Sequence, residues 1–447
     1  MRSALRIDLG LADFTLLVVG TIIGDGIFVV SGFGAQYLGP AQLVSWVVAG
    51  VLSALIGLAF IQCAAIRPGV GGSYAYVEAA FGPTVGFLAG WALYLGELAA
   101  LPVFPLAFVR YLGYFVPLKS PVASLLAGGS RDRREPPRRT LRRTPERCAD
   151  DRETRAVAAI GGGRRDIRGR EARTRGAQPR AVRSAPLGWG GFGTATVLIF
   201  WAYAGFELAV LPVGEVVAPR RTLPRGLLIG IAVATTVYVL VVLTVVIGLP
   251  WQDAASSSRP VTDALDAMLR GLGLPSGWGA AFISLGALVS IVGVCDAFML
   301  ALARLSYALA AGGSFPSIFA RLEQRHVTPW VGLVFQAVLA VGASLIFDVA
   351  AVLGTAVFFL GLCYAMTALS ALRLVQRAPE LALHVPGLRI VLLLAAVAGG
   401  YLAAQASITL AASGVLALLA GLAVYRWRRD VWRAGIAGAA DRPGDEA

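Results

Sequence analysis

Two glycines separated by one residue stand inside a strongly apolar stretch near the start of the chain. Gly24 and Gly26 flank Asp25 within the segment Gly20–Phe28, and a glycine pair is a place where an apolar helix can break. A break frees backbone N–H groups at the positive end of the second half-helix, which can receive a carboxylate. The spacing therefore predicts a break in the helix at which an anion can bind. The alternative is that the glycine pair serves only close packing between helices.

Further acidic side chains also fall inside apolar stretches. Asp25, Glu97 and Asp296 all sit at expected membrane depth, where acids mark substrate or ion pathways by default. Asp25 would repel a bound carboxylate unless it is protonated or turned away, and it could instead receive a cationic amine or a coupling proton. For the other two acids, structural pairing with Arg110 or Arg304 is an equally good interpretation.

The elements that position these residues are long apolar runs. The chain is 57% hydrophobic and 15% charged, where a soluble protein carries roughly 25% charged residues. A helix of about 20 apolar residues crosses a bilayer. Ten runs approach or exceed this length, which predicts an all-α integral membrane protein: 11–33, 41–65, 83–117, 190–217, 225–249, 279–311, 330–347, 349–376, 387–405 and 408–426.

Arginines mark every second connection between these runs. Cytoplasmic loops of membrane proteins carry an excess of basic residues, so the pattern predicts a multi-pass protein of the cell membrane with both termini in the cytoplasm. The arginines that carry the pattern are Arg2, Arg6, Arg67, Arg220, Arg221, Arg225, Arg321, Arg325, Arg373, Arg377, Arg426, Arg428, Arg429 and Arg433.

Residues 119–187 break this pattern. They hold 18 arginines and Lys119, the only lysine, against 8 acidic residues, whereas the topology puts them outside the cell. The window 133–152 cannot span a bilayer, because its charged residues would cost about 30 kcal/mol to insert. The composition is typical of a disordered segment. The expected division is helices over 1–118, this segment over 119–187, helices over 188–430 and a cytoplasmic tail over 431–447.

Several motifs together carry a family resemblance. The chain resembles the amino acid–polyamine–organocation permeases over most of its length, because the family's motifs occur in family order. They are Gly20–Phe28, Gly71–Trp91, Phe200–Glu207, Gly214–Arg225, Leu302–Ala320, Thr328-Pro329, Tyr364–Leu374 and Ala378–Leu381. The resemblance implies a secondary transporter of amino acids or related amines, proton-coupled or exchanging, with a five-helix inverted-repeat fold.

The resemblance also implies a substrate site at two broken helices. In the family a Gly-x-Gly break in the first helix binds the substrate carboxylate, which assigns that role here to backbone amides from Asp25 to Phe28. Carbonyls at the break of the sixth helix would hold the ammonium, and Trp201 and Tyr203 match aromatic positions that cover the substrate. The expected substrate-binding residues are Ile23, Gly24, Asp25, Gly26, Ile27, Phe28, Phe200, Trp201, Tyr203, Ala204 and Gly205.

Two acids are expected to act in gating or proton coupling. Glu207 matches an acidic family position with that role; the alternative is a buried acid hydrogen-bonded to backbone. Asp25 departs from the family, which usually has Ser, Thr or Ala between the two glycines. A carboxylate at this position puts the usual mode of substrate binding in doubt.

The family has twelve helices, and helices four and five are missing from the ten runs. The arginine-rich segment occupies their place and has about their length. Because a shifted frame in a GC-rich gene turns Leu, Ala and Val codons into Arg, Gly and Pro codons, we interpret the segment as frameshifted. The alternative is a genuine disordered outer loop.

Other classes of function fit less well. The cysteines lie far apart and the two histidines, His326 and His384, fall in predicted cytoplasmic loops, so we expect neither an enzyme nor a metal or cofactor site. Nucleic-acid binding by the basic segment is not expected, because that segment lacks interleaved aromatic residues. The expected partners are the lipid bilayer and a small-molecule substrate. The remaining alternative is the inert product of a damaged gene.

The frameshift interpretation can be tested on the nucleotide sequence. Translation of codons 119–187 in the other two frames is expected to give two apolar stretches of about 20 residues each. If neither frame contains such stretches, the segment is a genuine loop.

Overall fold

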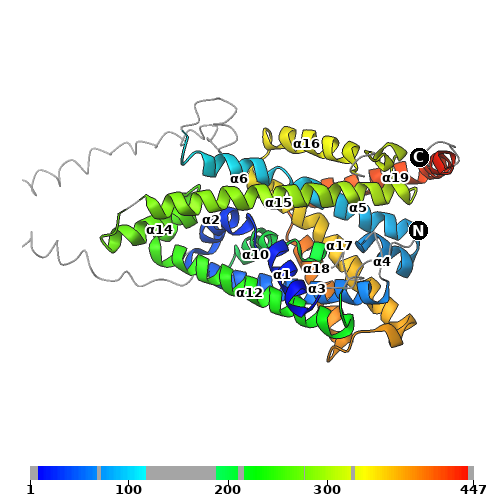
Figure 1. Ribbon diagram of the computed structural model, residues 1–447, viewed down its shortest axis with the longest axis horizontal. Helices are drawn as coiled ribbons and strands as arrows, with labels where there is room; N and C mark the ends of the chain where they lie inside the picture. The colour runs from blue at the N-terminus through cyan, green and yellow to red at the C-terminus, as the bar shows by residue number, and fades with distance from the viewer. Residues whose placement is uncertain are drawn as a thin grey trace, which may run out of the picture. The chain divides into compact units, whose positions relative to one another are not determined.

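The computed structural model describes residues 9–67, 72–116, 188–209, 216–275, 277–323 and 328–440. Within these ranges the regular structure is helical, apart from two isolated bridges, Leu9 with Val216 and Glu323 with Thr328. The arginine-rich segment 119–187 lies outside the described residues, so its interpretation as frameshifted stays a prediction. Figure 1 shows the helices coloured along the chain.

The described helices fall into two groups along the chain. Before the arginine-rich segment they are α1 (Leu11–Ile22), α2 (Gly26–Leu38), η1 (Gly39–Ala41), α3 (Gln42–Ile66), α4 (Gly72–Phe81), α5 (Pro83–Ala100) and α6 (Val103–Leu112). After it they are α10 (Phe192–Phe200), η3 (Trp201–Tyr203), α11 (Phe206–Ala209), α12 (Pro219–Gly248), α13 (Trp251–Ser256), α14 (Pro260–Gly271), α15 (Trp278–Ala311), η5 (Ser317–Ala320), α16 (Trp330–Ser344), α17 (Val349–Arg377), η6 (Pro379–Leu381), α18 (Leu388–Ala404) and α19 (Ile408–Ala440).

Each of the ten expected apolar runs coincides with a helix or with two half-helices. Six helical stretches of the described chain are long and apolar enough to cross a membrane, including Gly26–Ile66, Pro83–Leu112 and Val349–Arg377. The shorter pieces α1 and α10 are halves of broken helices. The helix α19 continues to Ala440, past the boundary at residue 430 that was expected for the tail.

The core lies where α3, α5, α17 and α18 pack together. Large aromatic side chains fill it, and Phe60 of α3 makes edge-to-face contacts with Phe206 and Tyr364 at 5.9 and 5.6 Å between ring centroids. Such aromatic contacts add to the free energy of packing beyond simple burial. This cluster supports the second half of the broken helix that begins with α10.

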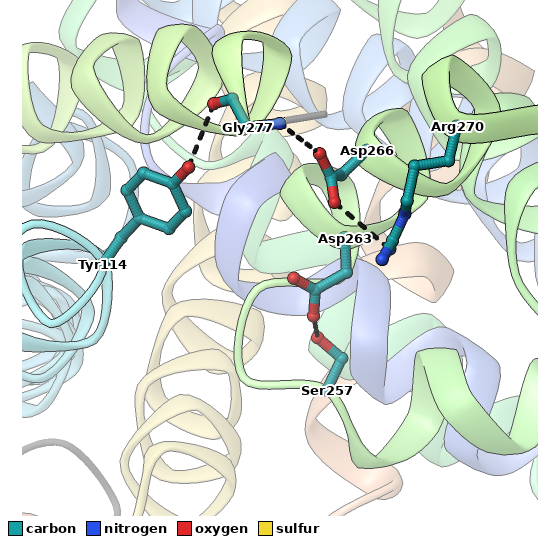
Figure 2. A network of polar contacts seen from close by, with 6 residues as sticks. All are labelled: Tyr114, Ser257, Asp263, Asp266, Arg270 and Gly277. Carbon is teal, nitrogen blue, oxygen red and sulfur yellow. Dashed lines mark hydrogen bonds and ion pairs between the residues drawn. The ribbon is translucent and has the colours of Figure 1, made fainter. Parts of the chain in front are cut away.

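A polar network closes the connection between α12 and α15, at the opposite end of these helices from α4 (Figure 1). Figure 2 shows its members. The Tyr114 hydroxyl donates to the Gly277 carbonyl at 3.0 Å, and the Gly277 amide donates to Asp266 at 2.7 Å. Asp266 also pairs with Arg270 at 3.1 Å. These contacts fasten α14 to the start of α15.

Two glycines allow α17 and α18 to approach closely. A Cβ on Gly399 would lie 2.5 Å from the Ala365 backbone nitrogen, and one on Gly361 would lie 2.8 Å from the Ala403 nitrogen. Small residues at a helix interface let two backbones meet, which is a common means of association in membranes. The neighbouring Gly400 has open space where its Cβ would be.

This packing generates a stability prediction. Gly399→Ala is expected to lower the melting temperature of the purified protein, because overpacking of this kind costs about 1–3 kcal/mol. Gly400→Ala is the matched control and should leave the melting temperature unchanged or raise it slightly. Equal melting temperatures for the two variants would contradict the close approach of α17 and α18.

Candidate functional site

The first helix breaks where the glycine pair predicted it. Helix α1 ends at Ile22, Ile23 has extended backbone (φ −76°, ψ 98°), and α2 begins at Gly26. Gly24 faces α15 closely, since a Cβ there would lie 2.7 Å from a methyl carbon of Val294. The break therefore needs glycine for close approach to a neighbouring helix.

The second break lies between α10 and α11. The short helix η3 follows α10, Ala204 is extended (φ −60°, ψ 144°), and Gly205 has φ +120°. A side chain is strained at this φ, and a Cβ on Gly205 would also collide with the Thr21 carbonyl oxygen. Gly205 thus turns the chain and allows contact with the first broken helix.

The two breaks are packed against each other. A Cβ on Gly26 would lie 2.5 Å from the Ala202 Cα atom, so the start of α2 touches η3 directly. The Tyr238 hydroxyl of α12 lies 2.6 Å from the Ile22 carbonyl oxygen and 2.8 Å from the Ala202 carbonyl oxygen. One buried hydroxyl therefore lies within hydrogen-bond distance of a carbonyl at each break, and its single proton can be shared between them or given to either one.

A cavity of about 300 Å³ lies beside the paired breaks. Both broken helices and α15 line it, together with one aromatic residue from α6. Its residues are Gly20, Thr21, Ile22, Gly24, Asp25, Gly26, Phe104, Trp201, Ala202, Ala204, Gly205, Ser290, Gly293, Val294, Ala297 and Phe298.

Six of the expected substrate-binding residues line this cavity, namely Gly24, Asp25, Gly26, Trp201, Ala204 and Gly205. Four others are not among the lining residues: Ile23, Ile27, Phe28 and Phe200. Tyr203 is also turned away, and its hydroxyl donates to the Trp46 carbonyl at 2.8 Å. Residues two positions apart in a 3₁₀ helix point in directions about 120° apart, and here Trp201 lines the cavity whereas Tyr203 does not.

Glu207 lies behind the second break and is 5% exposed. One of its oxygens accepts from the Tyr364 hydroxyl at 2.9 Å, and the other accepts from the Gly205 amide at 3.0 Å. The Glu97 carboxyl group is also buried, and it lies close enough to Glu207 for the two acids to interact electrostatically. The structure thus brings together Glu97 and Glu207, which are far apart in the sequence. Tyr364 of α17 contacts this pair through its hydrogen bond to Glu207.

Several of these residues have no sequence pattern that indicates a role at the site. Tyr238 contacts both breaks, yet its own neighbourhood in the sequence is an ordinary apolar helix. Phe104 and Phe298 line the cavity without any motif around them that indicates such a role. Tyr364 stood inside a family motif, which was the available signal for it.

One flank of the cavity is uncovered by the described residues. A helical stripe on α15 is exposed, and it includes Phe282, Val289, Val292 and Asp296. The cavity-lining Gly293 and Ala297 belong to the same exposed side. Because an acid in the middle of a membrane helix requires protein or water around it, lipid alone is a poor neighbour for this stripe.

Two broken membrane helices that meet beside a central cavity define a secondary-transporter architecture. The chain belongs to the amino acid permease family, whose model matches residues 9–125 and 156–429. This membership confirms the resemblance drawn from the motifs. The helices and apolar spans of the described residues confirm the all-α membrane fold class. The unmatched residues 126–155 lie inside the arginine-rich segment.

Individual relatives resemble the chain moderately. The branched-chain amino acid permease BcaP of Bacillus subtilis is 26% identical over 75% of this chain and 73% of its own length. The serine/threonine exchanger SteT of the same organism is 26% identical over 84% of this chain and 85% of its own. A solved structure of a manganese transporter mutant from Eremococcus coleocola has a TM-score of 0.46 at 12% identity, covering 95% of this chain and 94% of that one.

The contacts of the Tyr238 hydroxyl with both breaks lead to a testable prediction. Tyr238→Phe should lower the melting temperature, because buried carbonyls without a donor cost about 1–3 kcal/mol. Tyr307→Phe is the control, since the Tyr307 hydroxyl has no hydrogen-bond partner among the described residues. A Tyr238→Phe variant as stable as this control would show that the bridge contributes little.

Proposed function

We propose that this chain is a secondary transporter that carries an amino acid or a related amine across the cell membrane, with the cavity between the breaks as its substrate site. The observation that carries the proposal is the meeting of both breaks at one cavity. Relatives named as a branched-chain amino acid permease and a serine/threonine exchanger support this substrate class.

The ammonium group, which amino acids and amines share, would bind among acceptors. Asp25 and the Ala204 backbone lie on the cavity wall, and the end of a half-helix has exposed carbonyls and a negative dipole. Trp201 and Phe298 would cover the organic part of the substrate, with their ring centroids 5.9 Å apart. Alternating access would then rock one bundle of helices against the other.

Glu207 is our candidate for proton coupling. It is buried, holds the amide of the cavity residue Gly205, and has the Glu97 carboxyl group nearby. A proton gained by this pair would remove charge repulsion between the two acids and weaken the hold on Gly205. The protonation state of the pair would thereby change the second break.

The orientation proposed for the chain places both termini in the cytoplasm. Arginine contacts at the end of the helices near α4 support it. The Arg220 guanidinium donates to the Glu380 carbonyl at 2.7 Å, and that of Arg377 donates to the Ala79 carbonyl at 2.9 Å. A cluster of arginines at one membrane face is typical of the cytoplasmic side.

Uptake into proteoliposomes tests the function. The frame-restored chain should take up a member of a labelled amino acid and amine panel, faster under an inward proton gradient. Glu207→Gln should lose this acceleration but keep substrate exchange, because glutamine cannot carry the proton. The chain as written should be much less active, because the charged residues of 119–187 are too costly to insert in place of the two expected helices.

Tyr364→Phe is the matched control for the Glu207 variant. It removes the hydrogen bond to Glu207 but leaves the acid, so acceleration by the gradient should persist. An accelerated Glu207→Gln variant would exclude this acid as the coupling group. Absence of uptake of every panel member by the frame-restored chain would overturn the proposed function itself.

A further inference from the structure

Asp25 is a buried acid whose side chain no structural role explains. It is 4% exposed and lines the cavity. Although Asp25 precedes the first turn of α2, its side chain makes no capping hydrogen bond there. Its Oδ2 atom has no hydrogen-bond partner among the described residues. Buried carboxylates are normally paired, so the free oxygen calls for a donor from the cavity.

The other walls of the cavity suit an organic cation. Phe298 stands between two further aromatic rings, with its centroid 5.4 Å from that of Phe104 and 5.9 Å from that of Trp201. Aromatic faces attract ammonium groups. The remaining lining side chains are small or aliphatic, such as Val294 and Ala297, and among the lining residues Asp25 carries the only formal charge.

Asp25 also changes what the start of α2 can accept. A half-helix N-terminus would ordinarily attract a substrate carboxylate. Here the residue that immediately precedes α2 is itself acidic, and a negative charge at this position offsets the positive end of the helix dipole. A second carboxylate at the same place would face like-charge repulsion in a setting of low dielectric constant.

We infer that this site selects an organic amine without a carboxylate, whose ammonium group pairs with Asp25, over the corresponding α-amino acid. The inference rests on the proposed function and narrows its substrate class. The amine would donate to Oδ2 and place its hydrocarbon part against Phe104, Trp201 and Phe298. Its lack of a carboxylate removes the repulsion that an amino acid would meet.

Matched ligand pairs test the inference by competition binding to the purified full chain. Radiolabelled isoamylamine should be displaced by unlabelled isoamylamine at concentrations about tenfold or more below those needed for leucine. The pair phenethylamine and phenylalanine should behave in the same way. In each pair the two compounds differ only by the carboxylate.

Variants distinguish the contribution of Asp25 to ligand preference from that of the other cavity residues. Asp25→Asn should lose the preference for the amine, and Asp25→Ser should reverse it. Asp296→Asn removes an acid of α15 that does not line the cavity, so it should keep the preference of the unmodified chain. Size-exclusion profiles and melting temperatures identify any variant that fails to fold.

The outcomes distinguish this inference from the proposed function. Leucine binding equal to or tighter than amine binding in the unmodified chain overturns the inference but leaves amino acid transport standing. A preference for the amine that persists in folded Asp25→Asn and Asp25→Ser variants also overturns it. Binding of neither ligand class by the unmodified chain overturns the inference, and absence of uptake by the frame-restored chain then tells against the proposed function as well.

Discussion

The hydroxyl of Tyr238 connects the two broken helices at the centre of this protein. Two helices are interrupted within the membrane, and each interruption leaves backbone carbonyls without a helical partner, which lipid cannot supply. The hydroxyl lies within hydrogen-bond distance of a carbonyl at each break. The contact between Gly26 and Ala202, and the turn at Gly205, keep the breaks close enough for one group to serve both. The geometry of the cavity depends on this arrangement.

The second break connects two polar regions that would otherwise be separate. Gly205 lines the cavity, and its amide donates to Glu207 on the other side of the backbone. Glu207 in turn accepts from Tyr364 of α17. A change in the charge of Glu207 therefore acts on a residue of the cavity wall through one hydrogen bond. This is a short physical path between an acid and a binding site, and it passes through the backbone of a single glycine.

The sequence predicted the spans and the first break because both depend on local composition. A run of apolar residues is long enough to cross a bilayer whatever it packs against, and a glycine pair such as Gly24 and Gly26 weakens a helix wherever it lies. The direction of Tyr203 and the proximity of Glu97 to Glu207 could not be predicted in this way. They depend on how η3 rotates its side chains and on how α5 packs against the second break. Tyr238 escaped notice for the same reason, since its partners are distant in sequence.

The exposed stripe of α15 carries information about the element that must cover it. Gly286 and Gly293 have open space where a Cβ would be, so a covering backbone can come close at those two points. Asp296 on the same side requires a polar group of that element or water beside it. A membrane-helix face that the described residues leave exposed, with an acid in its middle, thus sets requirements on whatever segment covers it. That segment needs a backbone that can come close and a polar group that can face the acid.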